Sequence, residues 1–182
     1  GLRNFANAVG VASDPDAAGR GVLVVMGDRV FAARDVRKVR TRGTDAFKGF
    51  PRESIGLVTP SSVEWFGAAW REDDSRQFTF PERLPAVPVA YIYAGMDAAA
   101  LSCLLAGAQG VVLAGVGEGN MPEVVRQELV RFAADGLPVV RASRADEGLV
   151  DRETEDDANR FVAARALNPQ KARILLQLLI AN

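Results

Sequence analysis

The segments VPVAYIY (87–93), GVVLAGV (110–116) and VVRAS (139–143) are short and largely apolar, and stretches with helical spacing of apolar residues separate them. Such runs are typical of strands covered on both faces. Strands that alternate with helices of ~10–15 residues form right-handed crossovers and a parallel sheet. This half of the chain is therefore predicted to be an α/β unit with a parallel sheet flanked by helices.

The predicted helices carry their own start and stop signals. Asp97 and Asn168 are N-cap residues, Pro122 stands at a first helical position, and Gly136 at a left-handed cap before Pro138. The expected buried stripes are Leu101, Leu104 and Leu105 in the first helix and Val125, Leu129, Phe132 and Ala133 in the second. A last helix follows Asn168 and is rich in leucine.

The N-terminal part of the sequence predicts a helix at 2–11 and a strand at 21–26 (GVLVVM) that is covered on both faces. Residues 29–32 (RVFA) are expected to pair with that strand as a hairpin, and 55–58 and 62–66 are two further strand candidates. A helix that opens without a cap leads us to expect that the chain is part of a longer one.

Three polar stretches are predicted to lack regular structure. Residues 34–50 are polar and basic, with glycine or proline breaks nearby, which indicates a loop. Residues 67–85 have mixed charge and no lasting periodicity, which indicates a linker in which Phe78 and Phe80 are held against a surface. The acidic run ETEDD (153–157) is expected to be a solvated loop.

Composition excludes several kinds of chemistry. The 182 residues contain 22 Lys and Arg and 23 Asp and Glu, so the formal net charge of -1 argues against a protein that coats nucleic acid or an anionic membrane. The sequence contains no histidine, which excludes His-dependent triads. It contains one cysteine, Cys103, which excludes a disulfide framework and multi-thiolate metal sites. No apolar run approaches the ~20 residues that span a bilayer. We therefore expect neither a metal, a nucleic acid nor a membrane as partner.

The loops that follow the three predicted strands, 93–97, 115–120 and 141–147, lie at the edge where parallel sheets place their sites. The middle loop, GVGEGN, is glycine-rich and precedes a helix, as phosphate cradles do. However, Asn120 replaces the third glycine of the dinucleotide motif, and Glu118 adds a negative charge. A tight turn is therefore favoured over a phosphate site.

Six segments resemble, in order and spacing, the bacterial-type L-asparaginases and glutaminase-asparaginases. They are GRGVLVVM (19–26), ARDVRKVRT (33–41), VAYIYAGMDA (89–98), VVLAGVGEGN (111–120), VVRASR (139–144) and LNPQKARILLQL (167–178). The most specific feature is LNPQKAR after VVRASR. The resemblance covers nearly the whole chain.

The resemblance implies the second half of a chain with two α/β domains. Residues 1–66 would end the N-terminal α/β domain, 67–86 would be the linker, and 87–182 would form a small C-terminal α/β domain. The family carries its threonine nucleophile in a Gly-Gly-Thr segment and has a second Thr-Asp pair, and neither segment exists in this sequence. We therefore expect these residues to be inactive on their own.

The resemblance also implies roles for three residues. Lys38 matches the lysine of the family's Arg-Asp-Val-x-Lys motif, which completes a Thr-Lys-Asp group that handles protons, and the pKa of a lysine moves readily on burial. Glu153 matches the glutamate that reaches from a neighbouring subunit toward the substrate amino group. Gly95 stands where several members direct an asparagine at the neighbouring active site, which leaves the preference between asparagine and glutamine open.

The implied reaction converts L-asparagine to L-aspartate and ammonia through an acyl-threonine intermediate, without metal or organic cofactor. L-glutamine is a second candidate substrate, and a homotetramer built as a dimer of dimers is the implied assembly. The compartment, periplasm or cytoplasm, stays open. The alternative is a non-catalytic nucleotide-binding or regulatory module, with Arg141 and Arg144 near a phosphate held by the glycine-rich loop.

Overall fold

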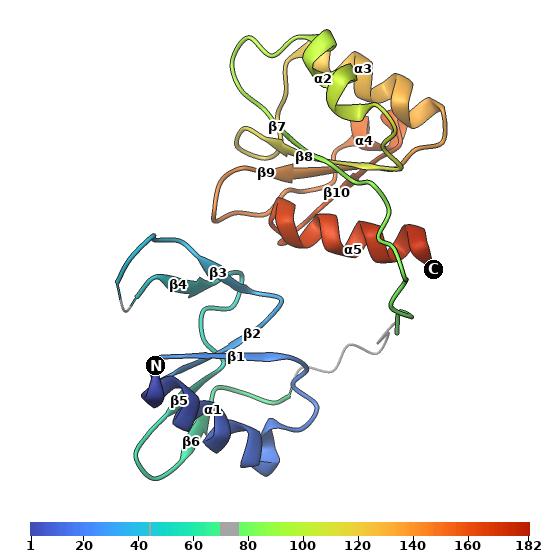
Figure 1. Cartoon of the computed structure of the whole chain (residues 1–182). Coiled ribbons are helices and arrows are strands. Elements are labelled where there is room, and N and C mark those ends of the chain that lie inside the picture. The colour runs from blue at the N-terminus through green and yellow to red at the C-terminus, as the bar shows by residue number, and fades with distance from the viewer. Residues whose placement is uncertain (44, 70–76) are drawn as a thin grey trace. The chain divides into compact units, whose positions relative to one another are not determined.

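A computed structural model describes residues 1–43, 45–69 and 77–182 of the chain. They belong to two compact units, Gly1–Arg76 and Gln77–Asn182, each built of helices and strands (Figure 1). Part of the predicted linker, residues 70–76, lies outside the described residues.

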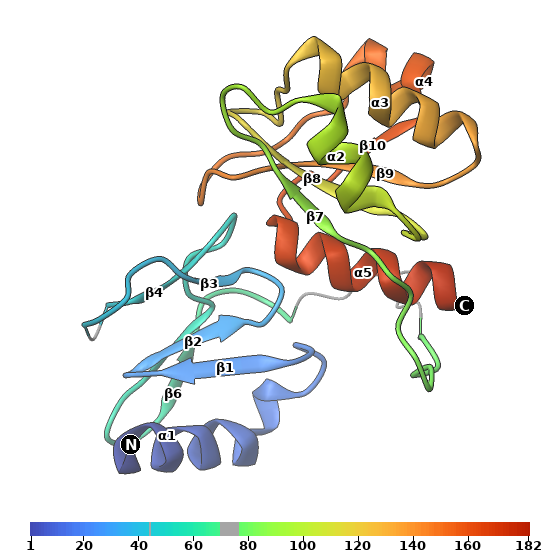
Figure 2. The ribbon, with the colours of Figure 1, turned by 45° about the horizontal axis from the view of Figure 1, so that its top comes forward.

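The N-terminal unit contains an antiparallel sheet in the order β1-β2-β5-β6. Its strands are β1 (Leu23–Met26), β2 (Arg29–Ala32), β5 (Gly56–Val58) and β6 (Val63–Trp65). Helix α1 (Leu2–Ser13) packs along β1 (Figure 2) and is followed by the short η1 (Pro15–Ala17). The side chains of Asn4 and Asn7 bond to the backbone of Gly27 in the β1–β2 turn, at 3.1 and 2.8 Å. The predicted hairpin and both later strands are confirmed.

Two expectations for this unit are wrong. Residues 34–50 are not a loop, because β3 (Val36–Lys38) and β4 (Phe47–Gly49) pair as an antiparallel two-stranded sheet. Both strands contain charged residues, in the sequences VRK and FKG, so no apolar run marks them as it marks β5. In addition, β1 is half-buried at all four positions instead of covered on both faces. Among the described residues, β1 has a strand partner on one side and α1 on one face.

The C-terminal unit contains the predicted parallel sheet, in the order β10-β9-β8-β7. Its strands are β7 (Val89–Tyr91), β8 (Val111–Gly115), β9 (Val139–Ser143) and β10 (Phe161–Ala163), and its helices are α2 (Ala98–Leu105), α3 (Glu123–Ala134), α4 (Thr154–Asn159) and α5 (Pro169–Ala181). Helices α2 and α3 cover one face of the sheet and α5 covers the other (Figure 1). The α/β prediction for this half is confirmed.

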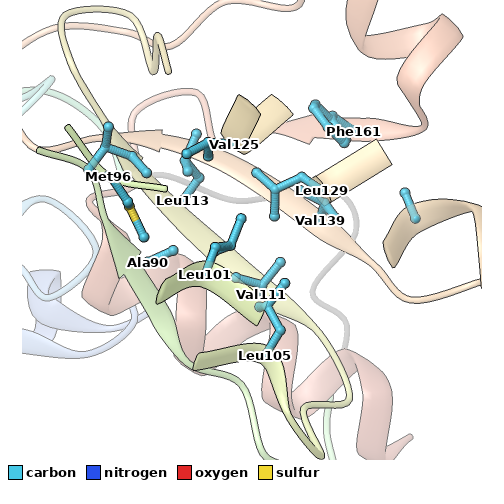
Figure 3. Close-up of a cluster of buried hydrophobic side chains, with 12 residues drawn as sticks. Ala90, Met96, Leu101, Leu105, Val111, Leu113, Val125, Leu129, Val139 and Phe161 are labelled. Carbon is cyan, nitrogen blue, oxygen red and sulfur yellow. The ribbon is translucent and has the colours of Figure 1, made fainter. Parts of the chain in front are cut away.

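The core of the C-terminal unit forms because β8 is buried at all five positions, between two layers of helices. On the α2–α3 side, Leu101, Leu105 and Leu129 pack toward the strands (Figure 3). Each such side chain stabilises the fold by about 1.5–3 kcal/mol through the area it removes from water. Leu104, predicted to join this stripe, is 40% exposed instead.

The predicted helix ends are confirmed, with one shift. The carboxylate of Asp97 accepts from the backbone N–H of Ala100 at 2.8 Å, and the side chain of Asn168 accepts from that of Lys171 at 3.0 Å. Gly136 follows α3 with a φ of +85°. Pro122 is the N-cap of α3, one residue before the position predicted for it.

Two more expectations fail in this unit. The run 153–157 is not a solvated loop, because most of it forms α4, which leads into the unpredicted strand β10. Phe80 is 81% exposed and is not held against a surface, whereas Phe78 is half-buried. None of the helices in the described ranges is long and apolar enough to cross a membrane.

Candidate functional site

One buried arginine in the middle of β9, Arg141, extends its guanidinium to the loop after β8 and to the start of α4. Arg141 is 2% exposed, and its guanidinium forms a bidentate pair with Asp156, with Nε–Oδ1 and Nη2–Oδ2 distances of 2.9 and 2.7 Å. Asp156 is 3% exposed. Removing two charges from water costs several kcal/mol per ion, so such a pair persists only when its other donors are satisfied. Here Nη2 also donates to the carbonyl of Asp151 at 2.6 Å, and Nη1 donates to the carbonyl of Glu118.

The ion pair moves the pKa of both partners. The hydrogen bond to Asp156 raises the pKa of Arg141, against the effect of burial, which lowers it. Burial by itself would raise the pKa of Asp156. The hydrogen bonds from Arg141 and from the Glu153 backbone, together with the charge of Arg141, outweigh burial and hold that pKa below its ordinary 3.8. Both groups are therefore charged at neutral pH.

Glu153 is the N-cap residue of α4 and sits directly beside this pair. Its backbone N–H donates to Asp156 at 2.9 Å, and its carboxylate Oε1 lies 3.4 Å from Nη1 of Arg141. The side chain remains 43% exposed. Because Asp156 already neutralises Arg141, the three groups together carry one negative charge, and the exposed carboxylate of Glu153 presents it to solvent. This arrangement is suited to receiving a cationic group.

The glycine-rich loop 115–120 is the predicted tight turn, closed by reciprocal backbone hydrogen bonds between Val116 and Asn120 at 2.9 and 2.8 Å. Gly119 has a φ of +88°, and a Cβ there would lie 2.7 Å from Cγ of Arg141. The guanidinium of Arg141 donates its hydrogen bonds to Asp156 and to backbone carbonyls, so it is not available to a phosphate, and the alternative that placed it near one is wrong. The guanidinium of Arg144 donates to the carbonyl of Ile92 at 2.8 Å.

Gly95 lies in the loop between β7 and α2, at the same edge of the sheet. It is exposed with a φ of +79°, and no described atom lies within 4 Å of where its Cβ would stand. The preceding residues, Tyr93 and Ala94, line a cavity of about 260 Å³ at the ends of β7 and β8. A side chain at position 95 would therefore have open space.

Lys38 is the last residue of β3 in the N-terminal unit. Its side chain is exposed, and its ammonium nitrogen lies 5.9 Å from the centroid of the Phe47 ring on the paired strand β4. Within this unit, Lys38 is therefore open to solvent. Among the described residues, no group of three or more His, Cys, Asp or Glu side chains is arranged to hold a metal ion.

Sequence reasoning missed the Arg141–Asp156 pair, although one signal for it exists. Arg141 interrupts a strand whose other residues are apolar or small, and a charge at the centre of a covered strand requires a buried partner. The sequence does not identify that partner, because Asp156 is one of several acidic residues in the run 153–157.

Comparison with known proteins agrees with the resemblance. A family model described as the glutaminase/asparaginase C-terminal domain matches residues 86–182, and one described as the N-terminal asparaginase domain matches residues 1–71. The chain is 40% identical to a probable periplasmic L-asparaginase of Haemophilus influenzae, an alignment that covers 100% of this chain and 54% of that protein.

Two other relatives give the same picture. The chain is 36% identical to a glutaminase-asparaginase of Pseudomonas aeruginosa, over 96% of this chain and 50% of that protein. It is 39% identical to L-asparaginase 2 of Escherichia coli, over 98% of this chain and 53% of that protein. The chain spans about half the length of the curated relatives it matches.

Proposed function

Because the chain belongs to the glutaminase/asparaginase family, we propose that it supplies part of the active site of an L-asparaginase. The reaction hydrolyses the side-chain amide of L-asparagine to L-aspartate and ammonia. A threonine hydroxyl outside these residues attacks the amide carbon, ammonia leaves, and water then releases L-aspartate from the acyl-threonine. The observation that carries the proposal is the exposed carboxylate of Glu153, held beside a buried ion pair at the carboxyl edge of the parallel sheet.

In this proposal Glu153 binds the α-ammonium group of the substrate in the site of a neighbouring subunit. The charge of the region supports this role, since Arg141 pairs with Asp156 at 2.7 Å and with Glu153 only at 3.4 Å, so the three groups keep one net negative charge. A carboxylate and an ammonium group form a charge-assisted hydrogen bond, which is stronger and shorter than a neutral one. Such a contact is present in the bound substrate as well as in the transition state, so it contributes mainly to binding.

Lys38 is the proposed catalytic residue from this chain. Its ammonium group would favour the ionised form of the attacking hydroxyl and assist the carboxylate that exchanges protons with it. Exposure of Lys38 at the end of β3 leaves the amine accessible to groups contributed by other parts of the protein.

The test for Lys38 is Lys38→Met in the complete protein, with Lys48→Met as the matched control on the paired strand β4. We expect kcat/KM of Lys38→Met to fall at least about tenfold, ~1.4 kcal/mol, mainly through kcat, and that of Lys48→Met to stay within about twofold. A smaller loss for Lys38→Met, or equal losses for both variants, would remove the catalytic role.

The proposed protein has two domains joined by a linker and assembles from several copies. Residues 67–86 connect the end of the N-terminal domain, 1–66, to the C-terminal domain, 87–182. The proposed assembly is a homotetramer, a dimer of dimers, as the family resemblance implies. A site completed by Glu153 of a neighbour requires at least two copies. Light scattering of the complete protein measures this directly, and a monomer that retains full activity would contradict it.

The overall proposal is tested by ammonia release from L-asparagine and from L-glutamine. The complete protein should release ammonia from L-asparagine, whereas the purified 182-residue chain should release none, because it lacks the Gly-Gly-Thr segment. Ammonia released by the pure chain would place the nucleophile within these residues. An inactive but folded complete protein would contradict the asparaginase function itself.

A further inference from the structure

We infer that Arg141 and Asp156 act as positioning residues for Glu153, holding its carboxylate at the sheet edge and keeping its charge available for the substrate ammonium group. This inference rests on the proposed contact between Glu153 and the substrate. It assigns a role to two features that the reaction leaves unused, namely the only fully buried ion pair among the described residues and the glycine-rich loop beside it.

The main chain around Glu153 is held in place by Arg141 and Asp156. Helix α4 has six residues, too few to be stable without tertiary contacts. Arg141 supplies such contacts on both sides of Glu153: it donates to the carbonyl of Asp151 before it and to the carboxylate of Asp156 after it. The backbone N–H of Glu153 donates to the same carboxylate at 2.9 Å. The main chain at Glu153 is therefore fixed by one guanidinium that belongs to the sheet.

The charge of Arg141 is balanced by Asp156 more closely than by Glu153. Asp156 receives two hydrogen bonds from Arg141 at 2.9 and 2.7 Å, whereas Glu153 lies 3.4 Å from the same guanidinium. Charge-assisted hydrogen bonds of full strength are about 2.7–2.9 Å long. Asp156 thus neutralises the arginine, and Glu153 is oriented by Arg141 without being captured by it. Without the charge of Asp156, Arg141 would pair with Glu153 and compete with a cationic ligand.

The glycine-rich loop completes this arrangement. The carbonyl of Glu118 accepts a hydrogen bond from Nη1 of Arg141, the nitrogen that also faces Glu153. Gly119 allows the arginine to reach that carbonyl, because any side chain there would meet Cγ of Arg141. The loop therefore satisfies a donor that would otherwise turn toward Glu153.

A second ion pair, between Asp157 of α4 and Arg152 just before the helix, provides a matched control. Arg152 and Asp157 are joined by a 2.5 Å contact, but their side chains are 69% and 57% exposed. Exposed pairs contribute little to stability, and this one does not involve Glu153. Asp157→Asn thus makes the same chemical change as Asp156→Asn, one residue along α4.

The experiment measures how well the complete protein distinguishes L-asparagine from succinamate, the same monoamide without the α-amino group. We expect Asp156→Asn to lower the kcat/KM ratio of L-asparagine to succinamate about tenfold, with most of the change in KM for L-asparagine. Asp157→Asn should leave the ratio within about twofold of wild type. A change that affects both substrates equally would indicate a merely structural role and overturn the inference.

Glu153→Gln separates this inference from the function on which it rests. If Glu153→Gln leaves the ratio unchanged, the proposed substrate contact fails. If Glu153→Gln lowers the ratio and Asp156→Asn does not, the contact stands and the positioning role is wrong. In the Glu153→Gln background, adding Asp156→Asn should change the ratio by less than about twofold, because both act through one group.

Arg141→Lys provides a second variant should Asp156→Asn fail to fold, as judged by circular dichroism. It keeps the positive charge but cannot form the bidentate pair. The expected result is a loss of selectivity in the same direction, again absent from the Glu153→Gln background. An unchanged ratio in folded Arg141→Lys would overturn the inference.

Discussion

Arg141→Met is expected to destabilise the C-terminal unit strongly. Methionine retains an apolar stem of similar length, but the variant leaves the carboxylate of Asp156, 3% exposed, without its cation. Breaking a buried pair from one side costs about 3–5 kcal/mol, mostly because the remaining charge stays desolvated. The carbonyls of Asp151 and Glu118 lose their donor as well, so we expect about 4 kcal/mol.

The pH dependence of this loss identifies its cause. In the wild type the pKa of Asp156 is lowered, so its contribution to stability is present above the unfolded pKa and is lost as pH falls through the folded one. Without Arg141, burial dominates and raises that pKa above its unfolded value. The carboxyl group of the variant then takes up a proton on folding, so the penalty is greatest at neutral pH and shrinks as pH falls through the raised pKa.

The assay is urea unfolding followed by far-UV circular dichroism at pH 7 and at acidic pH, with Arg152→Met as control. That control breaks an exposed pair at the start of α4 and should cost less than about 1 kcal/mol. The reasoning would be refuted by equal losses for the two variants, or by a loss for Arg141→Met that does not change with pH.

Two glycine substitutions test the remaining geometry. Gly119→Ala should destabilise the protein by at least about 2 kcal/mol more than Gly117→Ala in the same urea assay, since both have positive φ but an added Cβ meets Arg141 at Gly119 alone; equal losses would contradict this. Gly95→Asn should change stability by less than about 1 kcal/mol, because the site is open and asparagine tolerates the left-handed conformation. It should also change the ratio of asparaginase to glutaminase activity in the complete protein. An unaltered ratio would show that position 95 does not determine the preference between L-asparagine and L-glutamine.

The features that sequence predicts well here are those determined locally. The bounds of β9 follow from its apolar composition, and Asp97 and Asn168 cap α2 and α5 because their side chains reach backbone groups three residues ahead. By contrast, β3, β4 and β10 are three-residue strands within charged segments of the sequence, and α4 has six residues. Tertiary contacts stabilise elements of this length, and a local pattern does not contain them.

The candidate site also combines residues that the sequence predicts with contacts that only the fold reveals. Glu153, Gly95 and Lys38 were predicted by their place in family motifs, and their roles stay predictions. The pair that holds Glu153 joins residues 15 positions apart, in a strand and in a helix, and so requires the fold. Both charged runs for which the sequence predicts a loop, 34–50 and 153–157, contain buried charged groups, Arg37 in the first and Asp156 in the second. Charge density in sequence is therefore a poor guide to exposure when the opposite charge lies elsewhere in the chain.

The most direct test of the account is a crystal structure of the complete protein with L-aspartate bound. The account predicts that a carboxylate oxygen of Glu153 from a neighbouring subunit lies about 2.7–3.2 Å from the amino nitrogen of the ligand, with the Arg141–Asp156 pair intact behind it. A ligand whose amino group is held by other residues, with Glu153 outside hydrogen-bond distance, would contradict it.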